Sequence, residues 1–252
     1  QPEPSCAVGT VTVNVYGKIT FNIPGELQEY YNDFAVTSNG EVNLSFLSDF
    51  TADKHSRPLS SYGERHEYLY EADEDLENPD NVILMYSGDS RYWEEYSSGW
   101  NNYSPQTFNT EHIYPQSYLG DNDTAKWDMH HMRVADSEIN SQRFNFPFTE
   151  GAGGYDLINE NSWYPGDDWK GDVARMVMYV HIRYGEPFSD VGNIEMFLRW
   201  NVEDPVSPFE IQRNNVIEGA QGNRNPFIDN PYLATLIWDG TPAENKLSLI
   251  HI

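Results

Sequence analysis

Glu111 and His112 stand side by side in the segment 109–115. An imidazole with an ordinary pKa of about 6.5 can take a proton from water at neutral pH. A carboxylate oxygen is a ligand that hard divalent cations prefer. Pairs of this kind are common on protein surfaces, so the pair alone is weak support for a hydrolytic site.

A second group of polar residues follows further along the chain. Asn140 and Arg143 lie on one face of an expected helix. Asp136 is a suitable N-cap for that helix, and Glu138 suits its first turn. A strand with Glu and His, a second strand and then a helix that presents Asn is the ββα order of a one-metal nuclease site.

Short motifs along the chain resemble, in the same order, those of the bacterial endonuclease I family. These are secreted or periplasmic, sugar-non-specific nucleases of the ββα-metal (His-Me finger) group. The motifs run from about residue 27 to residue 239, and the ordered set is highly specific although each motif alone is common. They are Met85-Tyr86-Ser87, Thr110-Glu111-His112 through Pro115-Gln116-Ser117, Asp128-Met129-His130-His131, Glu138-Ile139-Asn140-Ser141-Gln142-Arg143 with Asn145-Phe146, Lys170-Gly171-Asp172-Val173-Ala174-Arg175, Arg199-Trp200 with Asp204-Pro205-Val206, and Gln221-Gly222-Asn223-Arg224-Asn225-Pro226-Phe227.

The resemblance implies that Glu111 and Asn140 hold one divalent metal ion and that His112 is the general base. Oxygen ligands completed by water suit Mg²⁺, with Mn²⁺ or Ca²⁺ as substitutes. Adjacent residues on a regular strand face opposite sides, so Glu111 and His112 can serve one phosphate only where the strand ends or twists. Pro115 fits such an end. The implied activity is largely sequence-non-specific, metal-dependent hydrolysis of DNA and RNA through backbone phosphates.

Arginines are the expected phosphate ligands. Arg143 is assigned a catalytic role as a bidentate phosphate clamp, although it could equally brace its helix against Asp128. Arg133 and Arg175 are expected to contact the substrate, in a local basic strip on an acidic protein. Asp172 and Arg175, three positions apart on a helix, also suit a structural ion pair.

Other histidines and aromatic residues have plainer interpretations. Asp128 and His130 are expected to support the site from behind the residues that react. His55 and His66 are expected on the surface. Four aromatic residues in the segment 93–103 could stack on nucleobases, but packing among themselves is the favoured interpretation: Trp93, Tyr96, Trp100 and Tyr103.

Two features depart from the better-known members of the family. Cys6 is the only cysteine, so no disulfide can form within the chain. The connection between Pro115 and Asp128 is short, so an arginine that relatives carry in a longer insertion has no counterpart here. The cation that stabilises the transition state is therefore not identified by the resemblance.

The elements that must position these residues are predicted by periodicity and capping. A helix is expected over 170–184 with Gly185 as C-cap. A capping box at Ser207 and Glu210 starts a helix that runs to about residue 220, and a short helix covers 232–238. Further helices are expected around 27–34 and 44–50, with a buried strand at 82–86. The fold class is α+β, a single mixed domain with a ββα-metal core and helices packed around a small antiparallel sheet.

The expected domain boundaries follow from these elements. Residues 1–26 form an N-terminal β ribbon or extension that turns near Gly17, residues 27–239 the nuclease domain, and residues 240–252 a C-terminal tail. No apolar run of about 18 residues appears, so no membrane span is expected.

The composition is strongly acidic, with 40 acidic and 15 basic residues among 252 and a net charge of −25. Charge alone argues against a nucleic-acid partner, whose binders usually carry a basic face. Adaptation to a salty medium, where surface charge is screened, is the favoured explanation. A monomer is expected, secreted or periplasmic. Structural Ca²⁺ in the acidic segments 71–75, 120–123 and 166–168 is a minority interpretation.

Two other hypotheses compete with the nuclease. Glu111, His112, His130 and His131 could form the site of a zinc hydrolase. Alternatively, the chain could be a secreted, acidic, aromatic-rich module that binds polysaccharide without catalysis, with calcium in its loops. Composition without the ordered motifs favours this last hypothesis.

Overall fold

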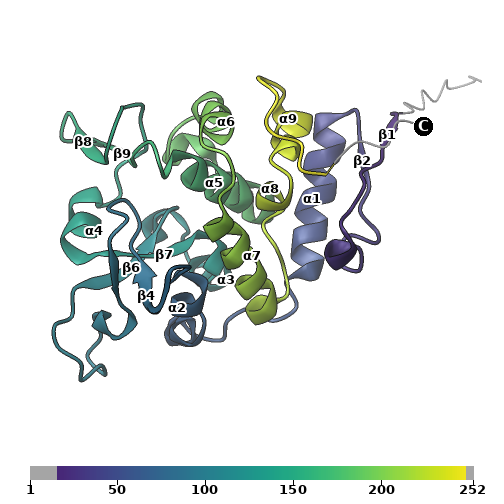
Figure 1. Cartoon of the computed structure of the whole chain (residues 1–252). Coiled ribbons are helices and arrows are strands. Elements are labelled where there is room, and N and C mark those ends of the chain that lie inside the picture. Colours follow the sequence, from purple (N-terminus) through teal and green to yellow (C-terminus); the bar gives the residue numbers. More distant parts are fainter. Residues whose placement is uncertain (1–15, 248–252) are drawn as a thin grey trace, which may run out of the picture.

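Short antiparallel strands alternate with helices in the computed structural model, which describes residues 16–247 (Figure 1). The helices are α1 (Gly40–Lys54), α2 (Leu69–Ala72), α3 (Asp123–Lys126), α4 (Ser137–Arg143), α5 (Lys170–Tyr184), α6 (Ile194–Glu203), α7 (Pro208–Gln221), α8 (Pro226–Asp229) and α9 (Tyr232–Trp238). The strands are β1 (Lys18–Ile19), β2 (Val36–Thr37), β3 (Glu74–Asp75), β4 (Asn78–Ile83), β5 (Ser90–Tyr92), β6 (Phe108–His112), β7 (Met132–Asp136), β8 (Asp156–Ile158) and β9 (Ser162–Tyr164).

The predicted α+β class is confirmed, but the strands form several small sheets rather than one. They pair as β1-β2, β3-β4-β5, β6-β7 and β8-β9, all antiparallel. The predicted strand at 82–86 is divided: β4 ends at Ile83, and Met85 forms an isolated parallel bridge with Ala135 of β7. This bridge attaches the β3-β4-β5 sheet to the β6-β7 pair.

Helix α5 is the central element, and 11 of its 15 residues are buried. It packs against α1 and α6, and Figure 1 shows it between the β6-β7 side of the molecule and α1. Gly185 ends it with a φ of 76°, in the left-handed region that glycine enters without steric cost. The predicted bounds and the predicted C-cap are both confirmed.

Local capping signals also fix the other long helices. Ser207 and Glu210 form the predicted capping box of α7, and α9 covers the predicted 232–238. Helix α1 is capped by Asn39 and extends beyond the predicted 44–50. A Cβ on Gly40 would lie 2.2 Å from the carbonyl oxygen of Ile237, so the first turn of α1 can meet α9 only with glycine there.

The predicted helix at 27–34 is wrong. Only a 3-10 turn, η1 (Gly25–Leu27), forms there and turns follow it. The aromatic residues that produced the helical pattern are nevertheless used: Tyr31 stacks on Phe50 of α1 with ring centroids 5.7 Å apart, and Phe34 packs edge-on against the same ring. The apolar residues of this segment are buried against α1 although the segment is not a helix.

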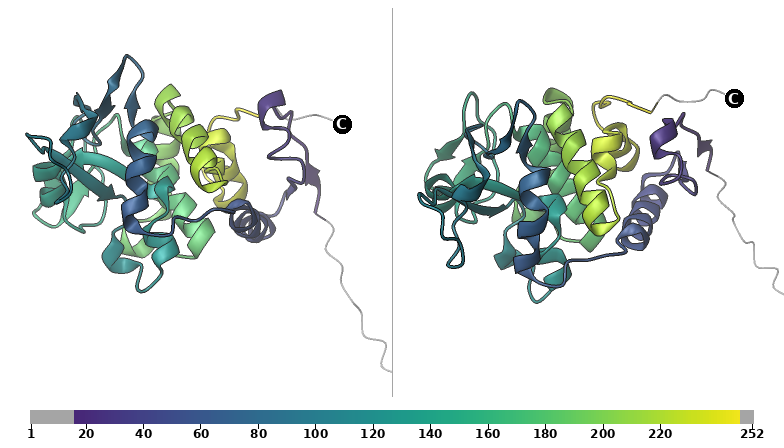
Figure 2. Two further views of the ribbon diagram at one scale, coloured as in Figure 1. Left: turned by 90° about the horizontal axis from the view of Figure 1, so that it is seen from below. Right: turned by 60° about the horizontal axis from the view of Figure 1, so that its bottom comes forward.

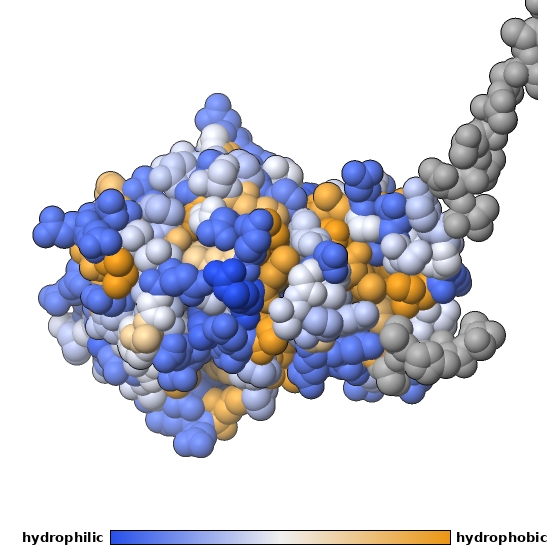
Figure 3. Space-filling view, turned by 90° about the horizontal axis from the view of Figure 1, so that it is seen from above, coloured by the Kyte–Doolittle hydropathy of each residue, from blue (hydrophilic) through white to orange (hydrophobic). Residues whose placement is uncertain are grey.

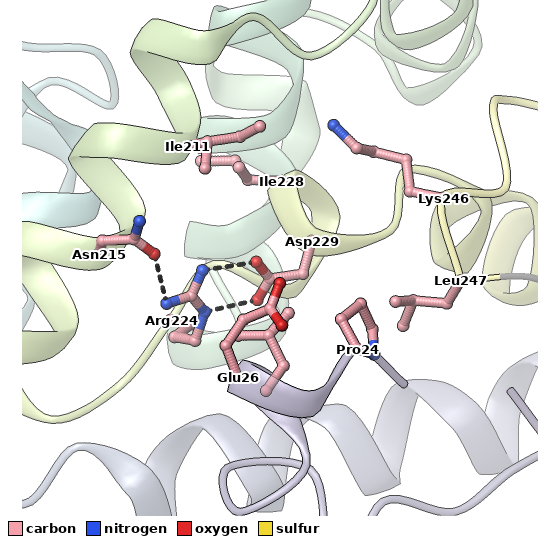
Figure 4. A pocket seen from close by; sticks show the side chains of 10 residues that line it. Pro24, Glu26, Ile211, Asn215, Arg224, Ile228, Asp229, Lys246 and Leu247 are labelled. Carbon is pink, nitrogen blue, oxygen red and sulfur yellow. Dashed lines mark hydrogen bonds and ion pairs between the residues drawn. The ribbon is translucent and has the colours of Figure 1, made fainter. Parts of the chain in front are cut away.

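The two ends of the described chain meet on one side of the molecule. Strand β1 pairs with β2, while the first arm of the predicted ribbon lies outside the described residues. Near the other end Leu247 is buried, and the Lys246 backbone N–H donates to Asn230. Leu247 also lines a hollow against Pro24 of the N-terminal segment (Figure 4).

Arg224, on the floor of this hollow, is fully engaged within the protein. Its Nε and Nη2 each donate to Asp229 at 2.7 Å, and Nη1 donates to Asn215 at 2.9 Å (Figure 4). The residue therefore joins α7 to α8 and does not line the pocket that holds Glu111 and His112.

Hydrophilic residues cover most of the face seen in Figure 3, with apolar residues exposed in small groups between them. Among residues 16–247, no helix is long and apolar enough to cross a membrane.

Candidate active site

The ββα unit forms in the predicted order. In the antiparallel pair β6-β7, Glu111 lies opposite Arg133 and His112 opposite Met132. Helix α4 follows directly, and the Asp136 carboxylate accepts from the backbone N–H groups of Glu138 and Ile139, as an N-cap does. The end of β6 and the inner face of α4 enclose an open pocket lined by Thr110, Glu111, His112, Pro115, Gln116, Ser117, Asn140, Ser141, Phe144 and Asn145.

Glu111 and His112 share this pocket because β6 stops at His112. Ile113 makes a last backbone bond to His131, and Pro115 then turns the chain away. The end of the strand lets two adjacent side chains reach one pocket. The strand therefore ends where it must if Glu111 and His112 are to serve one phosphate.

His112 is buried, and its ring is fixed from one side. Its Nε2 lies 2.8 Å from the carbonyl oxygen of Lys126, which can only accept, so Nε2 carries the proton and the lone pair is on Nδ1. The side-chain amide nitrogen of Gln116 lies over the ring, 2.9 Å from Nε2 and 3.2 Å from Nδ1. Burial, and to a smaller extent His131, lowers the pKa of His112 to about 3. The ring is therefore neutral at physiological pH.

Glu111 is buried with one oxygen engaged. Its Oε1 accepts from the Tyr86 hydroxyl at 2.7 Å and lies 3.0 Å from Arg143 Nε. The backbone N–H of His112 also lies within hydrogen-bonding reach of the carboxylate, and no side chain among residues 16–247 donates to Oε2. Burial raises the pKa of Glu111, and the charge of Arg143 and the bond from Tyr86 oppose that shift.

Asn140 is oriented by two acceptors. Its Nδ2 donates to Asn109 Oδ1 at 2.7 Å and to the Thr110 carbonyl at 3.2 Å. Because both neighbours accept, the amide nitrogen must face them, and Oδ1 is left for another partner. Asn140 and Glu111 line the same pocket, so each offers it an uncommitted oxygen.

The fit to a divalent ion follows from these oxygens. Glu111 Oε2 and Asn140 Oδ1 are hard ligands, and the open pocket leaves room for water as further ligands. A Mg²⁺ ion commonly keeps several waters and takes only one or two protein ligands. The residues present therefore suit Mg²⁺ or a similar ion.

Arg143 does not have the predicted geometry of a phosphate clamp. Its side chain is fully buried, paired with Glu111, and it donates through Nη1 and Nη2 to the carbonyls of Phe144 and Ile113. The alternative partner, Asp128, is not its partner either. Arg143 can affect the reaction only through Glu111, whose carboxylate it holds in place.

The prediction that Arg133 and Arg175 contact the substrate is wrong, because both side chains have zero exposure. Arg133 donates to Asp73 and Asp172, each at 3.1 Å. Arg175 forms a bidentate pair with Glu210 at 2.6 and 2.9 Å.

The predicted pair of Asp172 and Arg175 is present but longer, at 3.9 Å. Arg133 and Arg175 thus belong to a buried network of ion pairs and not to a basic strip on the surface.

Asp128 and His130 stand behind the pocket. The Asp128 carboxylate accepts from Tyr179 at 2.6 Å and Tyr184 at 2.7 Å, both on α5, and from the backbone N–H of His130. These contacts fix the chain just after α3, whose last residue, Lys126, is the hydrogen-bond partner of His112.

His131, rather than His130, contacts His112. Its ring centroid lies 5.4 Å from that of His112, whereas His130 Nε2 lies 3.0 Å from the carbonyl of Asn223. His55 was expected on the surface and is instead buried, with Nδ1 3.9 Å from Asp128. It is the residue that ends α1, as its C-cap.

Residues that the sequence did not single out complete the surroundings of His112. The Tyr62 ring stacks on the imidazole at 5.8 Å, and the Arg65 guanidinium lies 3.5 Å from the centre of the Tyr62 ring. Arg65 Nε donates to Thr110, which lines the pocket. No motif signalled these two residues, because they come from η2 (Tyr62–Glu67), far upstream in the sequence.

Most of the aromatic residues of the 93–103 segment pack among themselves, as the favoured interpretation held. Tyr96 stacks on Tyr70 at 5.0 Å and on Trp93 at 6.5 Å, and Tyr103 lies against Tyr92. Trp100 is 95% exposed but does not line the pocket.

The zinc hypothesis lacks its ligands. His131 Nε2 lies 2.7 Å from the carbonyl of Ala125, so both His130 and His131 direct a ring nitrogen to backbone oxygens. Within residues 16–247, no three His, Cys, Asp or Glu side chains are grouped to hold a metal, and this includes the acidic segments considered for calcium.

Comparison with known proteins gives one consistent result. The Endonuclease I family model matches residues 50–232. The chain is 40% identical over 205 residues to an extracellular ribonuclease of Bacillus subtilis (strain 168), covering 71% of this chain and 69% of the relative. It is 38% identical over 203 residues to an extracellular ribonuclease of Bacillus amyloliquefaciens, covering 71% and 68%.

A more distant match is to a periplasmic deoxyribonuclease of Aeromonas hydrophila, at 29% identity over 112 residues, covering 40% of this chain and 47% of the relative. The hypothesis of a binding module without catalysis is wrong, since the matching proteins are nucleases. The chain belongs to the endonuclease I family of phosphodiester-hydrolysing enzymes.

Proposed function

We propose that this protein is an extracellular or periplasmic, metal-dependent endonuclease that hydrolyses RNA and DNA with little sequence preference, as a monomer. One observation carries the proposal: His112, with its lone pair on Nδ1, lines one pocket together with Glu111 and Asn140, whose side chains each keep an oxygen for a cation. Relatives named as extracellular ribonucleases and periplasmic deoxyribonuclease support both substrates and the location.

His112 is the general base. The Lys126 carbonyl holds its Nε2–H, so Nδ1 is the atom that takes a proton from the attacking water. A base with a low pKa is a weak one. The negative charge of a bound phosphate favours the protonated ring, however, and so raises the pKa of His112 once substrate is present.

Glu111 and Asn140 hold the cation. A divalent ion bound there supplies Lewis-acid stabilisation to the phosphate and the leaving oxygen. Tyr86 and Arg143 fix Glu111 Oε1, which leaves Oε2 directed to the ion, and Asn109 fixes the amide of Asn140. An amide as the second ligand adds no negative charge, so the incoming phosphate meets less repulsion than it would from two carboxylates.

The test separates the base from the metal ligands. His112→Ala is expected to lower cleavage of plasmid DNA and of RNA by about 10²–10⁴-fold while calorimetry shows unchanged Mn²⁺ or Mg²⁺ affinity. Glu111→Ala is expected to lose both cleavage and metal binding. Glu138→Ala, an exposed acid on α4, is the matched control and should retain both. Activity that survives EDTA, or metal binding lost in His112→Ala, would refute the assignment.

A further inference from the structure

Phe144 is a large apolar side chain held at the edge of the catalytic pocket. The residue is 66% exposed and lines the same pocket as Glu111, His112 and Asn140. Apolar side chains of this size usually turn inward when a neighbouring core is available. Single exposed apolar residues are common on protein surfaces, so what distinguishes Phe144 is its place beside the proposed reacting groups.

The backbone of Phe144 is fixed in an unfavourable conformation. The residue ends α4 with φ 54° and ψ −128°, a region that residues with a Cβ rarely adopt. Its N–H donates to the carbonyl of Asn140 at 3.1 Å, and its own carbonyl accepts from the buried Arg143 at 2.9 Å. The exposed ring is therefore carried by the element that positions Asn140. Backbone strain of this kind is concentrated at functional sites.

A second exposed ring lies at the same rim. Tyr118 is 37% exposed, and its hydroxyl donates to the carbonyl of Asn145, the residue that follows Phe144 and also lines the pocket. Phe146 supports Phe144 from behind, with ring centroids 5.6 Å apart in a tilted arrangement. These residues form what we call the aromatic rim: Tyr118, Phe144 and Phe146.

The chemistry of the substrate identifies what such a rim can bind. Each phosphate of a nucleic acid has a nucleobase one sugar away on either side, and a flat apolar ring stacks on any base regardless of sequence. In a duplex those bases are already stacked and paired, so reaching the ring costs unstacking. In a single strand a base can swing out at much smaller cost.

We propose that the aromatic rim is a base-stacking subsite in which Phe144 receives the nucleobase next to the scissile phosphate, so that the enzyme prefers unpaired strands. The proposal rests on the nuclease function proposed above and adds a specificity determinant to it. Phe144 offers no hydrogen-bonding group, so the subsite selects for strand state and not for base identity.

A substrate without bases at defined positions tests the contact directly. A single-stranded oligonucleotide carries a central run of abasic (tetrahydrofuran) nucleotides, and cleavage at each phosphate is mapped on a sequencing gel. For the wild-type protein, cleavage within the abasic run is expected to be slower than at flanking phosphates by about 5- to 100-fold, the range for loss of one base–aromatic stack. Phe144→Ala is expected to cleave both regions at one similar, low rate.

Three further variants keep the test independent of folding. Phe144→Gly removes the ring and also relieves the positive φ, so it should fold at least as stably as the wild type and still lose the preference. Phe144→Trp should retain it. Trp100→Ala removes an even more exposed ring that does not line the pocket, and should behave as the wild type.

The outcomes separate this proposal from the one it rests on. If Phe144→Gly keeps the wild-type ratio between base-containing and abasic phosphates, or if its single-strand and duplex rates fall equally, the stacking subsite is refuted while the nuclease stands. A wild-type protein that cleaves no nucleic acid with Mg²⁺ or Mn²⁺ refutes both.

Discussion

Tyr86, which holds Glu111, and Phe144, which lines the same pocket as Glu111, both have a strained backbone. Tyr86 has φ 73° and Phe144 has φ 54°, although neither is glycine. Tyr86 uses this conformation to place its hydroxyl 2.7 Å from Glu111 Oε1, while burial raises the pKa of Tyr86 and so keeps the hydroxyl a donor. The bond occupies one carboxylate oxygen and leaves the other free. At the scale of single residues, the proposed metal site therefore predicts that affinity for the ion depends on the partners of its ligands.

Tyr86→Phe tests this directly. Loss of the donor should let the Glu111 carboxylate rotate, and we expect the Mg²⁺ concentration for half-maximal activity to rise by about 10-fold or more, as for other partners of metal ligands. The rate at saturating Mg²⁺ should change much less. Tyr155→Phe is the control, because no hydrogen bond from its hydroxyl is found in the described structure. Equal Mg²⁺ dependence in both variants would contradict the role given to Tyr86.

Protonation of His130 should make the stability of the protein depend on pH. Burial lowers its pKa from 6.5 to about 4, and Asp128 only partly opposes this. Between these two pH values the unfolded chain binds a proton that the folded protein excludes. Stability from this residue is complete above pH 6.5 and is lost as the pH falls toward 4, at up to about 1.4 kcal/mol per pH unit.

His130→Gln should reduce that slope. Glutamine can still donate to the carbonyl of Asn223 but cannot be protonated. Urea unfolding at several pH values between 4.5 and 7.5 should show a pH dependence shallower by about one proton's contribution. An unchanged slope would mean that His130 is already charged in the folded protein.

At the scale of helices and strands, the sequence predicts the features that depend on residues close together along the chain. Asp136, the Ser207–Glu210 box and Gly185 each act within a few residues, and each marked a helix end correctly. The ββα order and the residues at its pocket followed from motifs that are also local. The helix predicted at 27–34 failed because burial against Phe50 of α1, a tertiary effect, satisfied the same apolar pattern.

Partners far apart in sequence could not be predicted. Arg133 and Arg175 were expected at the substrate because an arginine without a visible partner is normally exposed. Their carboxylates come from Asp73, 60 residues upstream of Arg133, and from Glu210, 35 residues beyond Arg175. Lys126, whose carbonyl fixes the proton of His112, is likewise invisible as a partner because any residue type supplies a carbonyl.

The buried network around Asp73 joins three elements and carries a prediction of its own. Asp73 accepts from Arg133 and the backbone of Val134 on β7 and from Arg213 on α7. Asp73→Asn keeps the shape of the side chain but removes the negative charge that Arg133 and Arg213 share. The free energy of unfolding should therefore fall by about 3–5 kcal/mol. Denaturant unfolding measures the change, with cleavage assayed below the melting temperature.

The matched control is Asp89→Asn. Asp89 also pairs with an arginine, Arg91, at 2.9 Å, but its side chain is 51% exposed. An exposed pair contributes only about 0–1 kcal/mol. If Asp73→Asn cost no more than this, the network would not be what holds β7 to α7.

At the scale of the whole molecule, the charge of −25 opposes the substrate. Three of the cations expected to attract phosphate are buried, paired with Asp73, Glu210 and Glu111. The polyanionic substrate therefore approaches a negative protein, and salt should help by screening the repulsion. This is the reverse of the behaviour of basic nucleic-acid-binding proteins, whose affinity falls with salt.

Activity should thus rise with ionic strength. Between about 10 mM and about 150 mM NaCl the Debye length falls from about 30 Å to about 8 Å, and at fixed Mg²⁺ we expect kcat/KM on a long nucleic acid to increase several-fold. A dinucleotide, with a single phosphate charge, should show little change. Glu138→Lys, on the helix that carries Asn140, should raise the low-salt rate more than Glu29→Lys, an equal charge change on an exposed residue in the N-terminal segment on the opposite side in Figure 1. A rate that falls steadily with salt would instead require exposed cations around the pocket to outweigh the net charge, because repulsion and attraction respond to screening with opposite signs.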